Sequence, residues 1–166
     1  MKTTFSASAV TGSLLCLIAL GAGCSGKPRA AALPPEDAQK LLLDRNWLDR
    51  LPETAHDRLH VFRFVPAMGG GVYQDRTLFA GQFELFNFDH DGQTIRFHLR
   101  HTGEERSVAY TIDRVPEDGP LELHLHLEDS PRGPADYYSP RGMHGGGSEN
   151  DLEPALQQLW SKAAKH

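Results

Sequence analysis

Apolar residues occupy every second position in three segments, residues 94–100, 107–113 and 121–127. A period of two places alternate side chains on opposite faces of an extended strand. One face of these strands would carry Ile95, Phe97, Leu99, Val108, Tyr110, Ile112, Leu121, Leu123, Leu125 and Leu127. The connections are short enough for hairpins, so the sequence predicts an antiparallel meander rather than a parallel sheet.

The segment 82–88, just before this region, changes phase. Phe83 and Leu85 share one face of the expected strand, whereas Phe86 and Phe88 take the other. Two explanations fit the pattern. A β-bulge would shift the register, and burial of both faces would make the shift unnecessary.

Two more strands are predicted nearer the amino terminus. Residues 59–65 are apolar on one side and partly apolar on the other. The three glycines at 69–71 indicate a flexible turn or a close approach of the backbone to a neighbouring segment, because glycine has no side chain and adopts backbone conformations that other residues avoid. Residues 73–80 then form a further strand that ends at the break expected at Gly81.

Helices are predicted on both sides of the sheet. Residues 35–44 have apolar positions at helical spacing and acidic residues in the first turn, where the helix dipole favours them. A second helix, residues 151–164, has one apolar stripe and should pack on the sheet; the stripe consists of Leu152, Leu156, Leu159 and Trp160. The sequence therefore predicts one mainly β domain, residues 36–166, with flanking helices.

The segment 130–148 is rich in Pro and Gly, and we interpret it as a long loop. Its tyrosines, Tyr137 and Tyr138, can pack down over the sheet as part of a surface wrap. The alternative is that these tyrosines and the loop arginines bind an anionic or aromatic partner, since long loops are often functional.

The first residues have the pattern of an export signal. Lys2 gives a positive start, residues 14–20 are apolar, and small residues lead to Cys24. A transmembrane helix needs about 20 apolar residues, so the apolar run is too short to span a bilayer. Residues 24–35 are rich in Pro and Ala, and we expect them to form a tether.

The residues Leu20, Gly21, Ala22 and Gly23 before Cys24 resemble the lipobox of bacterial lipoproteins. The resemblance implies that residues 1–23 are removed and that Cys24 carries acyl chains such as palmitate. The protein would then be anchored in the cell envelope, in the outer membrane rather than the inner one, because Ser25 differs from the acidic residue that retains many such proteins. An ordinary secretory peptide cut nearby is the alternative.

The order of the motifs from 47 to 128 resembles that of lipocalin-like small barrels: an early Trp, a Phe-rich strand, a glycine turn and then alternating strands. The sequence shows six or seven such strands, where the family has eight. The resemblance implies a cup for a small apolar ligand, with a lining taken from Trp47, Phe97, Tyr110, Leu123, Tyr137 and Tyr138. The alternative is a structural or protein-interaction lipoprotein whose apolar row is a packed core.

Composition and residue spacing argue against several other functional classes. The formal charge of −5 and the absence of a basic patch argue against nucleic-acid binding. His98, His124 and His126 can lie on the solvent face of a sheet or converge on a metal, and we favour the solvent face and expect no metal or cofactor. A nucleophile, a base and an orienting group do not occur at recognisable spacing, so an enzyme is the least favoured class.

Overall fold

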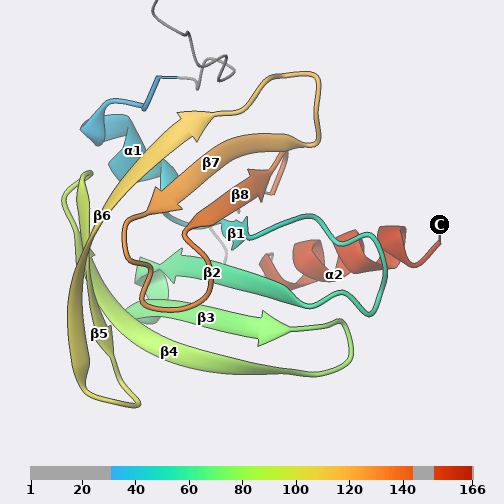
Figure 1. Cartoon of the computed structure of the whole chain (residues 1–166), viewed down its shortest axis with the longest axis horizontal. Helices are drawn as coiled ribbons and strands as arrows, with labels where there is room; N and C mark the ends of the chain where they lie inside the picture. The colour runs from blue at the N-terminus through green and yellow to red at the C-terminus, as the bar shows by residue number, and fades with distance from the viewer. Residues whose placement is uncertain (1–30, 144–151, 166) are drawn as a thin grey trace, which may run out of the picture.

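The computed structural model describes residues 31–143 and 152–165, and its centre is a closed antiparallel barrel of eight strands in sequence order (Figure 1). This confirms the predicted mainly β class with flanking helices. The strands are β1 (Asn46–Leu48), β2 (Leu59–Val65), β3 (Gly70–Arg76), β4 (Gly81–His90), β5 (Thr94–Leu99), β6 (Glu104–Arg114), β7 (Leu121–Leu127) and β8 (Asp136–Pro140). The helices are α1 (Pro35–Leu41), a 3₁₀ turn η1 (Pro66–Met68) and α2 (Leu152–Ala163).

The alternating apolar row forms the barrel interior, as its period predicts. On β5 the side chains of Ile95, Phe97 and Leu99 are buried, and those of Arg96 and His98 between them are exposed. The same alternation runs through β6 and β7. The interior therefore gathers one face from every long strand into a single hydrophobic core.

Two strands were missed by the sequence analysis. The interpretation of residues 130–148 as one long loop is wrong at β8, which pairs with β7 on one side and with β1 on the other. β1 is only three residues long and pairs with β2 as well. These short strands gain their hydrogen bonds by closing the barrel, and local alternation does not reveal them.

The glycine segment combines a turn with a close approach of the backbone. Gly69 lies in the turn after η1 with a φ of +70°, Gly70 and Gly71 lie within β3, and Gly81 begins β4 instead of breaking a strand as expected. A Cβ atom on Gly71 would overlap the Phe86 ring and the carbonyl oxygen of Arg63. Glycine is needed at this position because two chain segments approach closely there.

The phase change in β4 has neither of the two expected explanations. The registers with β3 and β5 run without a shift, so no bulge is present. Phe86 is buried in the core, whereas the outward side chains of Phe83 and Leu85 are 74% and 40% exposed. The apolar residues change face because those in the first half of β4 point outward to solvent, whereas those in the second half point into the core.

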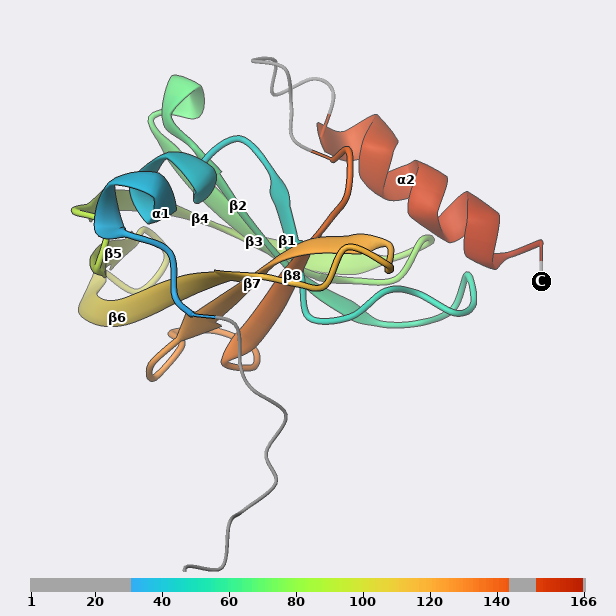
Figure 2. The ribbon, with the colours of Figure 1, turned by 90° about the horizontal axis from the view of Figure 1, so that it is seen from above.

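The two helices cover different surfaces (Figure 2). α1 closes one end of the barrel, where Ala38 and Leu42 join the core; this helix ends at Leu41, short of the predicted residue 44. α2 lies against the outside of the barrel and packs Leu156 and Trp160 on an apolar patch of β1 and β2, formed by Leu48, Leu59 and Val61. At the start of α2, Glu153 pairs with Arg63 and Arg76 at 2.8 and 2.6 Å.

The amino-terminal end of the described chain is attached to the barrel. Ala32 forms an isolated bridge with Asp113, and the Leu33 N–H donates to the Ile112 carbonyl oxygen at 2.8 Å. The last part of the expected tether is therefore held along β6. Cys24 and the expected signal, residues 1–23, lie outside the described residues.

Candidate functional site

The interior of the barrel is filled by aromatic rings. Phe62 lies at the centre, with its ring centroid 4.9 Å from Tyr73, 5.1 Å from Tyr137, 5.8 Å from Phe86 and 5.9 Å from Phe97. These are distances of direct ring contact. A ligand can therefore enter this part of the interior only by displacing the rings.

The structure places five of the six residues predicted to contact a ligand inside the barrel and one outside. Trp47, Phe97, Tyr110, Leu123 and Tyr137 are almost fully buried. Tyr138 lies on the outer face, where its ring stacks on His124 with a centroid distance of 4.9 Å. Ligand binding by the interior residues stays a prediction, and Tyr138 does not line the interior.

Trp47 occupies a defined polar position in addition to its apolar one. Its indole Nε1–H donates to the Leu42 carbonyl oxygen at 2.9 Å, just past the end of α1. The ring thus joins α1 to the barrel core. This bond accounts for an early tryptophan without assigning it to a ligand.

The end of the barrel opposite α1 is covered by the loop between β7 and β8. Arg132 of this loop pairs with Glu84 of β4 through two hydrogen bonds, of 2.7 and 3.1 Å. Gly133 has a φ of +65°, and a Cβ atom there would collide with the hydroxyl groups of Tyr137 and Tyr73. The loop lies directly on the aromatic core, and a longer ion pair of Arg132 with Glu104, at 3.9 Å, adds to the pair with Glu84.

A hydrogen-bonded pair, Tyr73 and His60, lies near this loop at the barrel mouth, which is the end of the barrel that the loop covers. The Tyr73 hydroxyl lies 2.6 Å from Nδ1 of His60. Burial, together with the carboxylates of Asp75 and Asp49, raises the pKa of Tyr73 to about 12. Tyr73 is therefore protonated at neutral pH and acts as a hydrogen-bonding group, without the activation that a nucleophile requires.

A chain of histidines and carboxylates runs across the outer faces of β6, β7 and β8. His124 lies between Asp113 and Asp136, with nitrogen–oxygen distances of 3.2 and 2.8 Å. His126 contacts the same oxygen of Asp136 at 2.8 Å. Burial opposes ionisation of Asp136, but the hydrogen bonds from His126 and His124 outweigh it and lower the pKa of this carboxyl.

The sequence analysis placed both histidines on one face but did not identify Asp113 and Asp136 as their partners. The cross-strand register supplies these contacts, since Asp113 lies opposite His124 and Asp136 opposite His126. Within the described part of the chain, no group of three or more His, Cys, Asp and Glu side chains is arranged to hold a metal ion. The chain of residues links three strands on a polar face.

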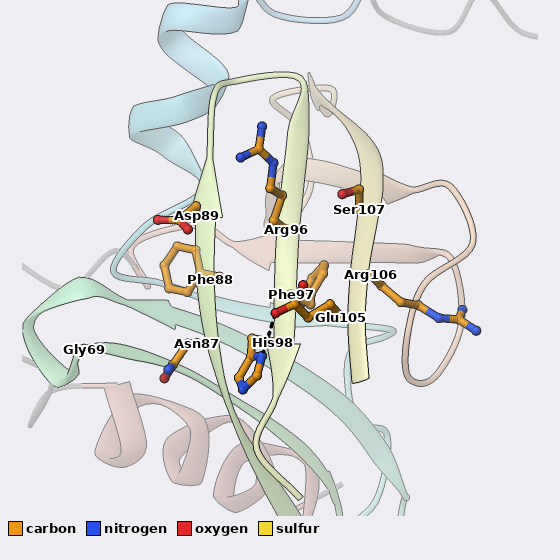
Figure 3. Close-up of a pocket in the computed structure, with 10 residues that line it drawn as sticks. All are labelled: Gly69, Asn87, Phe88, Asp89, Arg96, Phe97, His98, Glu105, Arg106 and Ser107. Carbon is orange, nitrogen blue, oxygen red and sulfur yellow. Dashed lines mark hydrogen bonds and ion pairs between the residues drawn. The ribbon is translucent and has the colours of Figure 1, made fainter. Parts of the chain in front are cut away.

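His98 lies on a separate polar face, formed by β4, β5 and β6 (Figure 3). It contacts Glu105 at 3.3 Å, and a shallow groove of about 600 Å³ runs past Asp89, Arg96 and Ser107. The Glu105 side chain is 81% exposed. Pairs at such exposure contribute little to binding or stability, and this face has the character of a solvated sheet surface.

Apolar side chains are exposed on the hairpin that joins β3 to β4. Phe79 in the turn is 69% exposed, and Phe83 and Leu85 lie on the adjoining strand. A groove of about 680 Å³ follows this part of β4 and is lined by apolar and charged side chains together, among them Tyr73, Leu85 and Arg100. Exposed large apolar side chains gathered in one place mark an interaction surface more often than chance.

No family model, curated protein or solved structure matches this chain. Among the described helices, none has the length and apolar character needed to cross a bilayer. Of the surfaces described above, the β3–β4 hairpin combines apolar exposure with a groove.

Proposed function

We propose that this protein is an exported lipoprotein, anchored through acyl chains on Cys24 in the bacterial cell envelope, and that its barrel is a scaffold for binding another protein. The observation that carries the binding role is the contrast between filled interior and exposed hairpin. Phe62 contacts rings on all sides, whereas Phe83 is 74% exposed. Apolar contact area is therefore offered to a partner on the outside of the barrel.

The closed barrel suits this role. Every long strand contributes to one core, and closure leaves most of the backbone paired. A partner that binds such a scaffold meets a surface already in its binding conformation, which reduces the entropy lost on association. The lipid would restrict encounters to the envelope surface, and outer-membrane attachment is the location we propose.

A second candidate, the lipocalin-like cup for a small apolar ligand, is favoured by the loop at the barrel mouth. The ion pairs of one side chain, Arg132, with Glu84 and Glu104 hold that loop over the aromatic core. Release of Arg132 would expose Tyr137 and Tyr73 to an entering molecule. Entry would also require the rings to separate, and this is why we place the cup second.

The two candidates differ in what the purified protein carries. Native mass spectrometry of the mature protein, extracted in mild detergent from its own host's envelope, should show protein and covalent lipid only. A further mass that is lost on denaturation would support the cup and contradict the scaffold. Each result identifies one candidate.

The anchor has its own test. Cells fed labelled palmitate should incorporate the label into the protein, and Cys24→Ala should lose both the label and the membrane fraction. Incorporation that persists in Cys24→Ala would contradict lipidation at this residue. Cys24→Ser is a suitable second variant, because it keeps the size of the side chain and removes the thiol.

A further inference from the structure

The first half of β4 is an unpaired sheet edge inside an otherwise closed barrel. β3 pairs with β4 as far as Gly81, but the pairing of β4 with β5 stops at Phe86 and Leu99. β5 then turns away toward β6, so that residues 81–85 have a strand neighbour on one side alone (Figure 1). The ladder is thus open on this side over residues 81–84, and at Leu85 only one backbone hydrogen bond, from the Arg100 N–H, crosses it.

The backbone groups that face this opening follow from the register. The Arg100 N–H donates to the Leu85 carbonyl oxygen at 3.4 Å, so the carbonyl of Leu85 points to the β5 side. In an antiparallel ladder, alternate residues direct their N–H and C=O groups to the same side. Those of Phe83 and Gly81 therefore also point to the β5 side, beyond the end of that strand.

The groove of about 680 Å³ lies along this edge. Phe83 and Leu85 border it from the outer face of β4, and Tyr73 and Glu84 border it from the barrel mouth. A strand placed here would find hydrogen-bonding groups in its plane and apolar side chains beside it. This combination is the one that proteins use to bind extended peptides by strand addition.

The charges at the groove favour a negative partner. Its two carboxylates are already neutralised, because Glu84 pairs with Arg132 and Asp75 pairs with Arg58. Arg100 is hydrogen bonded to the amide oxygen of Asn87 at 2.8 Å and, among the described residues, forms no ion pair. The charge left over at the groove is positive.

We infer that residues 81–85 of β4 bind an extended acidic peptide segment of a partner protein as an added strand that continues the line of β5. Arg100 contacts a carboxylate of the partner, and an apolar side chain of the partner packs on Phe83 and Leu85. The inference deepens the proposed scaffold function and rests on it. A lipid bilayer fits less well, because it would leave the backbone groups of Phe83 and Gly81 without partners in an apolar medium.

The test uses the full-length protein in detergent and two synthetic capped hexapeptides, one alternating Glu with Val and the other alternating Lys with Val. Fluorescence anisotropy should show at least tenfold tighter binding of the acidic peptide, weakening with added salt. Hydrogen exchange followed by NMR should slow at the N–H groups of Gly81 and Phe83 when this peptide binds. Equal binding of both peptides, or unchanged exchange at both residues, would overturn the inference.

Four variants separate the parts of the site. Phe83→Pro removes the edge-facing N–H together with the ring and should lower affinity at least tenfold, whereas Phe83→Ser removes the ring alone and should lower it less; proline is tolerated at a sheet edge because that N–H has no ladder partner. Arg100→Gln should remove most of the preference for the acidic peptide. Met68→Ser is the matched control, since Met68 on η1 is also an exposed apolar side chain, 48% exposed, but does not line the groove, and it should change affinity less than twofold.

Other occupants give distinct results. Self-association of the unmodified chain that Phe83→Pro abolishes, measured by sedimentation, would assign the edge to a second copy and overturn the inference. Binding of vesicles of phosphatidylethanolamine and phosphatidylglycerol, lost equally in Phe79→Ser and Phe83→Pro, would assign it to a membrane. If the acidic peptide does not bind while the native mass shows no small molecule, the edge proposal fails and the scaffold proposal stands. A bound small molecule contradicts the scaffold itself.

Discussion

The barrel interior and the β3–β4 hairpin both carry clustered phenylalanines, but their surroundings are opposite. Phe62 and Phe86 are about 1% exposed and touch other rings, whereas Phe79 and Phe83 are more than two-thirds exposed. Burial stabilises the folded chain by removing apolar area from water, and the exposed rings gain nothing of this kind. The same residue type therefore contributes to stability in one region and is available for binding in the other.

A third apolar region lies between these extremes. The outer surface of β1 and β2 would be exposed in the bare barrel, yet the chain covers it with Trp160 and Leu156 of α2. No described segment covers Phe83 in the same way. The protein thus covers one outer apolar patch and leaves another open, which supports a binding role for the open one.

The largest expected effect on the free energy of unfolding comes from a substitution in the barrel interior. Phe62→Ala should lower the free energy of unfolding by about 3–5 kcal/mol, because it removes a buried ring and leaves a cavity among Tyr73, Phe97 and Tyr137. Urea denaturation measured by circular dichroism gives this value. A loss below about 1 kcal/mol would mean that the interior is loosely packed, and this would favour the lipocalin-like cup for a small ligand.

Glu153 joins the start of α2 to β2 and β3 through its ion pairs with Arg63 and Arg76. Glu153→Gln should cost about 2 kcal/mol, since Arg63 is only 8% exposed and would keep a buried charge without its carboxylate. Glu153 is itself 36% exposed, so we expect less than for a fully buried pair. Denaturation of the variant and of Glu153→Asp, which keeps the charge, measures the effect; equal losses would show that shape and not charge matters.

The same carboxyl predicts a pH dependence. Burial acts to raise the pKa of Glu153, but Arg76 and Arg63 outweigh it and hold the pKa below its usual 4.5. The pair therefore contributes its full stability above about pH 4.5 and loses it as the pH falls through the lower folded-state value. Unfolding measured from pH 7 to pH 3 should show a smaller loss for Glu153→Gln than for the unmodified chain.

The histidine and carboxylate chain should have a smaller effect. The pKa of Asp136 is held below 3.8, so its contribution is present above about pH 3.8 and is lost on further acidification. Asp136 is 51% exposed, and screening by water limits this contribution to below about 1 kcal/mol. Asp136→Asn should reduce the acid sensitivity of unfolding, and an unchanged profile would show that the chain of contacts adds no stability.

The smallest expected effect on the free energy of unfolding comes from a substitution on the exposed β3–β4 hairpin. Phe83→Ser should change the free energy of unfolding by no more than about 0.5 kcal/mol, because the ring is exposed and no core contact is lost. The urea midpoint of this variant is compared with that of Phe62→Ala. A loss of several kcal/mol would mean that Phe83 has a structural role, and the binding interpretation would lose its main support.

The strands with unbroken alternation could be predicted from the sequence, and so could the two helices. The closing strands could not, because β1 and the five-residue β8 depend on partners far along the chain. The partners of His124 could not be predicted for the same reason, because the cross-strand register decides which carboxylate lies opposite the histidine. The phase change at Phe83 and Leu85 was visible in the sequence, but it was interpreted as a feature of folding when it marks an exposed surface.

The attachment of Leu33 to Ile112 has a consequence for how the protein stands on a membrane. The segment from Cys24 to Ala32 can reach at most roughly 30 Å when fully extended. With the proposed lipid at Cys24, the α1 end of the barrel would be the membrane-proximal end. The open edge of β4 lies toward the opposite end and would face away from the bilayer (Figure 1). A partner would then meet Phe83 from the aqueous side.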